Sequence, residues 1–312
     1  GQPQVTVTLK NELMAGRISH AYLFTGSRGT GKTTCAKILA KAVNCLDPQN
    51  GDPCGKCDVC RGLDDGSVLD VVELDAASNN GVDSIRALIE ESNFTPTTAK
   101  YRVYIIDEVH MLSVSAFNAL LKTLEEPPAH VIFILATTEV HKLLPTILSR
   151  CQRFDFRRIA PEDIAGRLEW VCTQENVTID HDAAMLIAVT ADGGMRDALS
   201  TLEQLSVFGN GAVHADDARS LLGEVSDQIL GEFARAIADR DVAELYGLIR
   251  AQVEEGNDLL ELTRDLVAHV RDVYVACVAR ARAELFEGGS EQAEALAAEA
   301  AAFGEHPADR LA

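Results

Sequence analysis

The chain has 312 residues, of which 47% are hydrophobic and 24% charged, with a formal net charge of −20. Its apolar runs are far shorter than the ~20 residues of a bilayer-spanning helix, and its eight cysteines lack the pattern of a secreted disulfide scaffold. These features exclude a membrane-spanning protein and a small disulfide-rich domain, and they predict a globular protein of two or three domains.

The charge is unevenly spread. Residues 1–158 carry 17 Lys and Arg against 18 Asp and Glu, net −1, whereas residues 159–312 carry 11 against 30, net −19. The first half is compatible with nucleic acid, which would repel the second. Gly1–Gln4 lack the basic region and apolar core of a signal peptide. From the cysteine pattern we expect a reducing, cytoplasmic compartment. The chain begins at Gly1 and stops at Leu311-Ala312 without an obvious cap, so we expect a fragment of a longer protein.

Helical and strand patterns alternate in the first half. Residues 3–15 are ambiguous, because Val5–Thr8 favours a strand while Leu9, Leu13 and Met14 share one helical face, and we expect a helix. The β-rich apolar runs that follow are Ala21–Thr25, Leu69–Leu74, Arg102–Asp107, Val131–Ala136 and Arg153–Phe156. Strands separated by helices of this length predict a parallel α/β sheet.

The first of these runs leads into a candidate phosphate loop. The sequence Gly26-Ser-Arg-Gly-Thr-Gly-Lys-Thr33 matches GxxxxGK[ST] and opens a helical segment, whereas a chance glycine-rich turn is the alternative. Such a loop wraps the phosphates of ATP with backbone N–H groups; Lys32 would reach the β- and γ-phosphates and Thr33 would help hold Mg²⁺. The predicted nucleotide-binding residues here are Gly26, Ser27, Arg28, Gly29, Thr30, Gly31, Lys32, Thr33 and Thr34.

A cysteine cluster interrupts the pattern after the loop's helix. Cys45, Cys54, Cys57 and Cys60 form a CxxCxxC run with one thiol upstream, enough for a closed tetrahedral Zn²⁺ site. An iron–sulfur cluster and free thiols are the alternatives, and the first lacks its usual spacer to a further Cys-Pro. We expect residues 45–60 to form a structural zinc module, with the other four cysteines uninvolved.

Two carboxylates, those of Asp107 and Glu108, stand at the end of the strand predicted over Arg102–Asp107. Asp107 would support Mg²⁺, and Glu108 would orient or deprotonate an attacking water. A strand that ends in solvated acids is the alternative. The Asp-Glu pair favours hydrolysis over a kinase reaction, which would not need Glu108.

Strand patterns cease after Pro161. Helical segments rich in Ala, Leu and acidic residues run to the end of the chain, with breaks near Gly209–Gly211 and Gly223. We therefore expect an all-helical second half, with a three-helix unit first and a further bundle after it. The tail at 291–302 is either a surface helix or partly disordered.

Taken together, these motifs resemble those of AAA+ ATPases, and more closely the gamma/tau family of bacterial DNA polymerase III clamp-loader ATPases. The resemblance rests on the phosphate loop, the cysteine cluster and further motifs over the whole chain, most specifically over residues 18–200: His20–Gly26, Asp75–Ser78, Asp107–Leu112, Asn118–Pro128, Leu135–Thr138, Ser149–Cys151 and Gly193–Leu199. It implies a P-loop sheet domain at 1–158, a helical lid at 159–222 and a helical collar at 223–312, truncated at its end.

The resemblance also implies roles for three more residues. Thr138, with Thr137 as the alternative, would be the polar sensor residue at the phosphates and would take part in catalysis. Arg196, on the lid, would touch the γ-phosphate of its own site, and Arg150 would be a catalytic arginine finger for a neighbouring subunit. Structural ion pairs are the alternative for both arginines. The family segment that cradles adenine is expected to precede Gly1.

As partners, the resemblance implies the delta and delta-prime subunits, the beta sliding clamp, further copies of the chain and primer–template DNA, with no membrane. Helix starts near Ser78–Gly81 and Ser113–Ser115 would offer N–H groups to DNA phosphates, although ordinary helix capping is an equal alternative. Two other functions compete with a clamp-loading ATPase. One is a different AAA+ DNA motor, such as a branch-migration helicase, and the other is a nucleotide-binding scaffold that hydrolyses little ATP.

Overall fold

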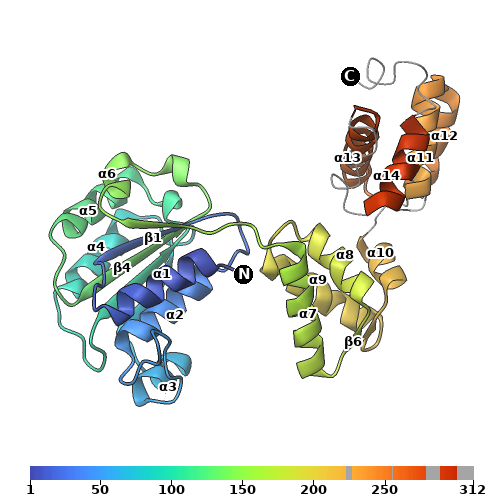
Figure 1. Cartoon of the computed structure of the whole chain (residues 1–312). Coiled ribbons are helices and arrows are strands. Elements are labelled where there is room, and N and C mark those ends of the chain that lie inside the picture. Colours follow the sequence, from blue (N-terminus) through green and yellow to red (C-terminus); the bar gives the residue numbers. More distant parts are fainter. Residues whose placement is uncertain (223–226, 255, 279–288, 301–312) are drawn as a thin grey trace. The chain divides into compact units, whose positions relative to one another are not determined.

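The computed structural model describes residues 1–222, 227–254, 256–278 and 289–300 (Figure 1). The chain forms two compact units, residues 1–213 and residues 214–312. The predicted domain limits at 158 and 222 stay predictions, and the start of the predicted collar at residue 223 lies outside the described residues. Among the helices of the described ranges, none combines the length and the apolar character that crossing a membrane requires.

A five-stranded parallel sheet forms the centre of the first unit (Figure 1). Its strands lie in the order β2-β3-β4-β1-β5. β1 and β4 are buried along their whole length, as expected for strands covered on both faces. The strands are β1 (Ala21–Thr25), β2 (Val71–Asp75), β3 (Arg102–Asp107), β4 (Val131–Thr137) and β5 (Gln152–Asp155). The predicted parallel α/β sheet is confirmed, with shifts of one or two residues at β2, β4 and β5.

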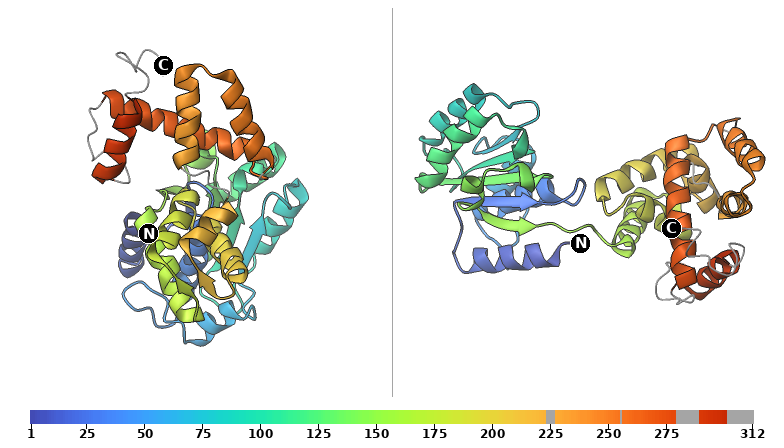
Figure 2. Two further views of the ribbon diagram at one scale, coloured as in Figure 1. Left: turned by 90° about the vertical axis from the view of Figure 1, so that its right-hand side faces the viewer. Right: turned by 90° about the horizontal axis from the view of Figure 1, so that it is seen from above.

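Helices cover both faces of this sheet. One face packs on α1 and α2, and the other on α4, α5 and α6 (Figure 2). Alternate residues of the strands contribute to each of the two cores. α3 lies within the cysteine-rich insertion. The elements are α1 (Pro3–Met14), α2 (Lys32–Asn44), α3 (Asp58–Asp64), α4 (Val82–Ser92), η1 (Val109–Met111), α5 (Val114–Glu125), η2 (Val140–Lys142) and α6 (Pro145–Leu148).

The helix expected over residues 3–15 is confirmed as α1. Its β-branched residues favour a strand locally, but Val5 and Leu9 are one helical turn apart and both are buried against the sheet. Packing of that face therefore outweighs the local strand propensity.

Three helices follow the sheet within the first unit, α7 (Pro161–Glu175), α8 (His181–Thr190) and α9 (Met195–Phe208). They are the predicted three-helix unit, and α9 ends at Gly209. One addition departs from the all-helical expectation. β6 (Thr178–Ile179) and β7 (Ala212–Val213) pair as a two-stranded parallel sheet that ties the start of α8 to the end of α9.

The second unit is helical where it is described. α11, α12 and α13 share one apolar core, and α11, α13 and α14 share another. The helices are α10 (Ala215–Leu222), α11 (Asp227–Asp239), α12 (Val242–Glu254), α13 (Leu259–Val278) and α14 (Gly289–Ala300). The tail expected as a surface helix or partly disordered is α14 up to Ala300, and residues 301–302 lie outside the described residues.

Two helix starts named as candidate DNA contacts adjoin each other. Ser113 caps α5, since its Oγ accepts a hydrogen bond from the Ala116 N–H at 3.2 Å. α4 begins after Gly81, and the Ser113 N–H donates to the Asn80 carbonyl at 3.1 Å. Capping is thus present at α5, and contact with DNA phosphates at either start stays a prediction.

Asp70 anchors the loop before β3. Its carboxylate is buried and accepts hydrogen bonds from the backbone N–H groups of Thr97 (2.9 Å), Thr98 (2.8 Å) and Ala99 (2.8 Å). Burial is the largest single influence and acts to raise the pKa of Asp70, but these N–H groups together outweigh it and hold the pKa below its usual range.

Asp70→Asn should lower the free energy of unfolding at neutral pH by about 2–3 kcal/mol, because the amide turns an NH₂ donor toward backbone donors. Since the folded-state pKa is depressed, this stabilisation is present above the unfolded-state pKa of ~4, and is lost as pH falls through the folded-state pKa. Urea unfolding of both proteins across this range checks it, with Asp83→Asn at the exposed start of α4 as control. A difference between wild type and Asp70→Asn that persists at the lowest pH would contradict the assignment.

Candidate functional site

The phosphate loop, residues Gly26–Thr33, joins the end of β1 to the start of α2. Gly26 has a φ of 147°, and a Cβ there would collide with the Phe156 carbonyl oxygen. Gly29 has a φ of 75°, and its Cβ would lie 2.9 Å from the Cα of Gly194 at the start of α9. The glycines are therefore required by conformation and by close backbone approach. The loop ends at the N-terminus of α2, where unpaired N–H groups favour an anion.

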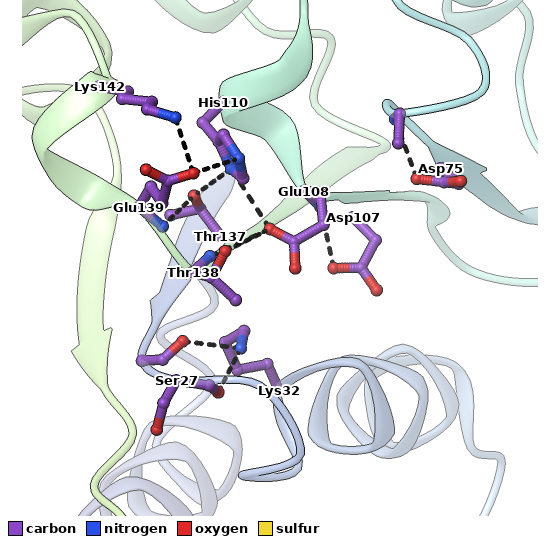
Figure 3. A network of polar contacts seen from close by, with 12 residues as sticks. Ser27, Lys32, Asp75, Asp107, Glu108, His110, Thr137, Thr138, Glu139 and Lys142 are labelled. Carbon is purple, nitrogen blue, oxygen red and sulfur yellow. Dashed lines mark hydrogen bonds and ion pairs between the residues drawn. The ribbon is translucent and has the colours of Figure 1, made fainter. Parts of the chain in front are cut away.

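Lys32 folds over the loop that precedes it. Its Nζ donates hydrogen bonds to the carbonyl oxygens of Gly26 (2.8 Å) and Ser27 (2.7 Å), and the residue is buried (Figure 3). Burial lowers the pKa of Lys32, while the carboxylates of Glu108 and Asp107 act in the opposite direction.

Thr33 and Asp107, the two residues predicted to hold Mg²⁺, are in contact. The Thr33 hydroxyl donates to Asp107 Oδ2 at 2.6 Å, which joins the start of α2 to the end of β3. The other carboxylate oxygen, Oδ1, accepts the Glu108 N–H at 2.9 Å. A hydroxyl and a carboxylate at this spacing are the oxygen ligands that Mg²⁺ prefers, so the donor set fits the ion.

Glu108 follows β3 in a left-handed conformation with a φ of 46°, which is unusual for a residue with a side chain. Its Oε2 accepts hydrogen bonds from the Thr138 N–H (3.1 Å) and hydroxyl (2.9 Å), and lies 3.3 Å from His110 Nδ1 (Figure 3). Thr137 instead contacts His110. The structure thus brings Thr138, rather than Thr137, to Glu108.

A cavity of about 1090 Å³ lies in the first unit, between the phosphate loop, the end of β3 and helices α7 and α9. The predicted site residues that line it are Arg28, Gly29, Thr30, Gly31, Lys32, Thr33, Thr34, Asp107, Glu108 and Arg196. Gly26, Ser27 and Thr138 lie next to these residues but not in the lining. The Met195 N–H donates to the Gly29 carbonyl at 3.1 Å, so α9 is held at the loop beside Arg196.

Sequence reasoning missed the α7 wall of this cavity. Trp170, the one tryptophan of the chain, lines it together with Arg167, whose guanidinium lies 4.0 Å from the indole centroid. The only available signal was the rarity of tryptophan, since helical spacing alone does not say which face of α7 meets the phosphate loop.

Arg150 lies outside the cavity lining. Its guanidinium forms an ion pair with Glu125 at 2.6 Å and donates to the Thr146 carbonyl at 2.7 Å, and about a third of its side chain is exposed. The residue is thus placed on the surface and does not line the cavity of its own chain.

The four clustered cysteines converge, and their sulfur atoms all lie within 4.8 Å of one another. Backbone N–H groups donate to the sulfurs of Cys45 (3.2 Å), Cys54 (3.3 Å) and Cys57 (3.4 Å), as suits thiolate ligands. The N–H of Leu46 is the main cause that lowers the pKa of Cys57 to about 6, and burial raises that of Cys60 to about 12. A tetrahedral Zn²⁺ with ~2.3 Å bonds to sulfur fits this set.

The family comparisons cover almost the whole chain in three successive matches. Residues 1–160 match the family described as "DNA polymerase III, delta subunit", and residues 163–211 match "DNA polymerase III clamp loader subunit, ATPase lid domain". Residues 213–307 match "DNA polymerase III subunits gamma and tau domain III".

Among curated relatives, the chain is 49% identical over 273 residues to the DNA polymerase III subunit tau of Bacillus subtilis, with 88% of this chain and 48% of the relative covered. It is 44% identical over 280 residues to the gamma/tau subunit of Mycobacterium tuberculosis, with the same coverage of 88% and 48%. The chain thus spans about half the length of these curated relatives.

Among solved structures, the chain resembles the Thermotoga maritima RuvB Holliday junction branch migration motor with a TM-score of 0.52 and 19% identity, over 76% of this chain and 72% of that chain. At this identity the likeness shows the fold alone, a parallel α/β sheet domain followed by helices. The family is set by the sequence matches instead: the chain belongs to the gamma/tau family of DNA polymerase III clamp-loader subunits.

Proposed function

We propose that the chain is the ATPase motor part of a bacterial replicative clamp loader, which uses ATP binding and hydrolysis to place the beta sliding clamp on primed DNA. One observation carries the ATPase proposal. The phosphate loop and the end of β3 meet at a single cavity through the 2.6 Å hydrogen bond between Thr33 and Asp107. Membership of the gamma/tau family supports the clamp-loading role.

In this proposal six of the predicted site residues in or beside the cavity have assigned roles. Lys32 exchanges its carbonyl partners for the β- and γ-phosphates, and Thr33 and Asp107 hold Mg²⁺. When bound, that ion neutralises charge developing on the phosphate oxygens. Glu108 orients or deprotonates the attacking water, and Arg196 reaches the γ-phosphate from α9. Thr138 acts through Glu108, because its N–H and hydroxyl both hold Oε2 of that carboxylate.

We infer that Cys45, Cys54, Cys57 and Cys60 hold one structural Zn²⁺. The convergence of four sulfurs supports this, and the metal would give a short insertion a core that it lacks on its own. We place the site outside the ATPase chemistry, because none of the four cysteines lines the cavity.

Elemental analysis should find one zinc per chain, and none after Cys57→Ser and Cys60→Ser together. Cys172→Ala is the matched control, because that thiol is buried in α7, and it should retain the metal. Iron in the purified protein, or zinc that survives the double substitution, would contradict the assignment. The side chain of Cys277 lies outside the described residues.

The proposed partners are the delta and delta-prime subunits, the beta sliding clamp, further copies of the chain and primer–template DNA, all in the cytoplasm. The charge division supports this arrangement. A near-neutral ATPase region is compatible with DNA, whereas the acidic helical region suits contact between subunits.

The test is the rate of ATP hydrolysis by the full-length protein with its partner subunits, measured with and without primed DNA and clamp. We expect the rate to rise when both are present. Equal rates under all conditions would support the scaffold alternative. A rise with branched DNA and without clamp would support a branch-migration motor.

A further inference from the structure

His110 connects the two carboxylates next to the ATPase cavity. It lies in η1, directly after Glu108 and Val109, and its side chain is only 6% exposed. Nδ1 is 3.3 Å from Glu108 Oε2 and 2.9 Å from the Thr137 hydroxyl, and Nε2 is 3.2 Å from Glu139 Oε1 (Figure 3). The ring therefore occupies the space between two acidic side chains.

The two oxygens of Glu108 have different surroundings. Oε2 is held by both donors of Thr138 and faces His110. Oε1 has no hydrogen-bond partner among the described residues, and Glu108 lines the cavity whereas His110 does not. The carboxylate is thus anchored by one oxygen, which leaves the other for the water that it would orient.

The far side of the ring is also fixed. Glu139 accepts from Lys142 Nζ at 2.8 Å, and this hydrogen bond holds the pKa of Glu139 below its usual range. Nε2 of His110 lies 3.2 Å from Oε1 of Glu139, the same oxygen that accepts from Lys142. Thr137 joins the two sides, because its hydroxyl contacts Nδ1 and also accepts the Glu139 N–H at 3.0 Å.

We propose that His110 is a positioning residue for hydrolysis, which keeps Oε2 of Glu108 on Thr138 and Oε1 directed into the cavity. The proposal rests on the ATPase function proposed above. Without the ring, the carboxylates of Glu108 and Glu139 would face each other as like charges, and Oε2 of Glu108 would lose one of its three contacts. A displacement of about 1 Å at a reacting group costs up to ~10²-fold in rate.

The rival role is structural, in which His110 only fixes the loop after β4 through Glu139. Substitutions that keep the contact of only one of the two ring nitrogens distinguish the positioning role from the structural one. The amide of an asparagine reaches the position of Nδ1, toward Glu108, and the amide of a glutamine reaches the position of Nε2, toward Glu139.

The experiment compares His110→Asn and His110→Gln in the full-length protein, by single-turnover hydrolysis and ATP affinity. We expect His110→Gln to lose roughly 10–100-fold in rate with ATP affinity retained, and His110→Asn to stay within a few-fold of wild type. The control is His141→Gln, because that exposed histidine lies 3.6 Å from Glu139 Oε2 and outside the network at Glu108. Should His110→Gln not fold, His110→Phe keeps the ring volume without either contact and should show the same loss.

A double substitution completes the test. If His110 acts through Glu108, adding His110→Gln to Glu108→Gln should slow hydrolysis no further. Additive losses in rate, or a His110→Asn protein as slow as His110→Gln, would overturn the inference. The proposed ATPase function would still stand in either case, because it depends on turnover by the wild-type protein. A wild-type protein that binds ATP and never hydrolyses it would overturn the proposed function, and this inference with it.

Discussion

Replacing Arg150 by alanine should lower ATP hydrolysis about 10³-fold at the pocket of a neighbouring subunit, and leave ATP binding by the mutated subunit intact. The reason for this expectation is where the Arg150 side chain lies on its own chain. The guanidinium does not line the cavity of its own chain and is held at the surface by Glu125 and the Thr146 carbonyl. In the proposed assembly, a fixed planar charge of this kind would stabilise charge on a phosphoryl group bound by another subunit.

The measurement uses assemblies in which a wild-type pocket faces either an Arg150→Ala subunit or a Glu108→Gln subunit. The pocket that faces the Arg150→Ala subunit should not hydrolyse ATP, whereas the pocket that faces the Glu108→Gln subunit should. Arg153→Ala, on β5 and half exposed, is the matched control. Equal turnover in both arrangements would make Arg150 a structural ion-pair residue. In that case Glu125→Gln, which breaks the pair, should reproduce whatever defect Arg150→Ala shows.

Glu108→Gln should slow hydrolysis roughly 10²–10³-fold while ATP affinity stays close to wild type, whereas Lys32→Ala should weaken ATP binding itself. The amide keeps the shape of the side chain and its contact with Thr138 but cannot accept a proton from water. Lys32, by contrast, contributes the buried charge of the phosphate loop. Calorimetric titration with ATP and phosphate release from the same samples separate the two effects.

Glu126→Gln, an exposed acid at the end of α5, serves as the control for loss of a negative charge. Normal hydrolysis by Glu108→Gln within the assembly would show that another group orients or deprotonates the attacking water. Loss of ATP affinity equal to that of Lys32→Ala would show instead that Glu108 is a binding residue.

Much of the sheet could be predicted because its three central strands, β1, β3 and β4, are largely buried on both faces. β1 and β3 have the predicted bounds, since a continuous apolar run ends at the glycine of the phosphate loop or at the acidic pair. The contact of Thr33 with Asp107 followed as well, because the ends of parallel strands meet at one edge of a sheet.

Other features depend on contacts that sequence spacing does not contain. β6 and β7 are two residues each and pair across more than thirty residues, so no local pattern marks them. The position of His110 between two carboxylates requires the left-handed turn at Glu108 and the neighbouring end of β4. Trp170 lines the cavity only because α7 and α9 pack beside the phosphate loop.

The most direct test of the clamp-loading account is transfer of the beta clamp onto primed circular DNA by the full-length protein with its partner subunits. Wild type and Lys32→Ala are compared, with and without ATP, and clamps retained on the DNA are counted. The account predicts that wild type loads clamps only with ATP and that Lys32→Ala does not load them under either condition. Equal loading by the two proteins, or loading by wild type without nucleotide, would contradict it.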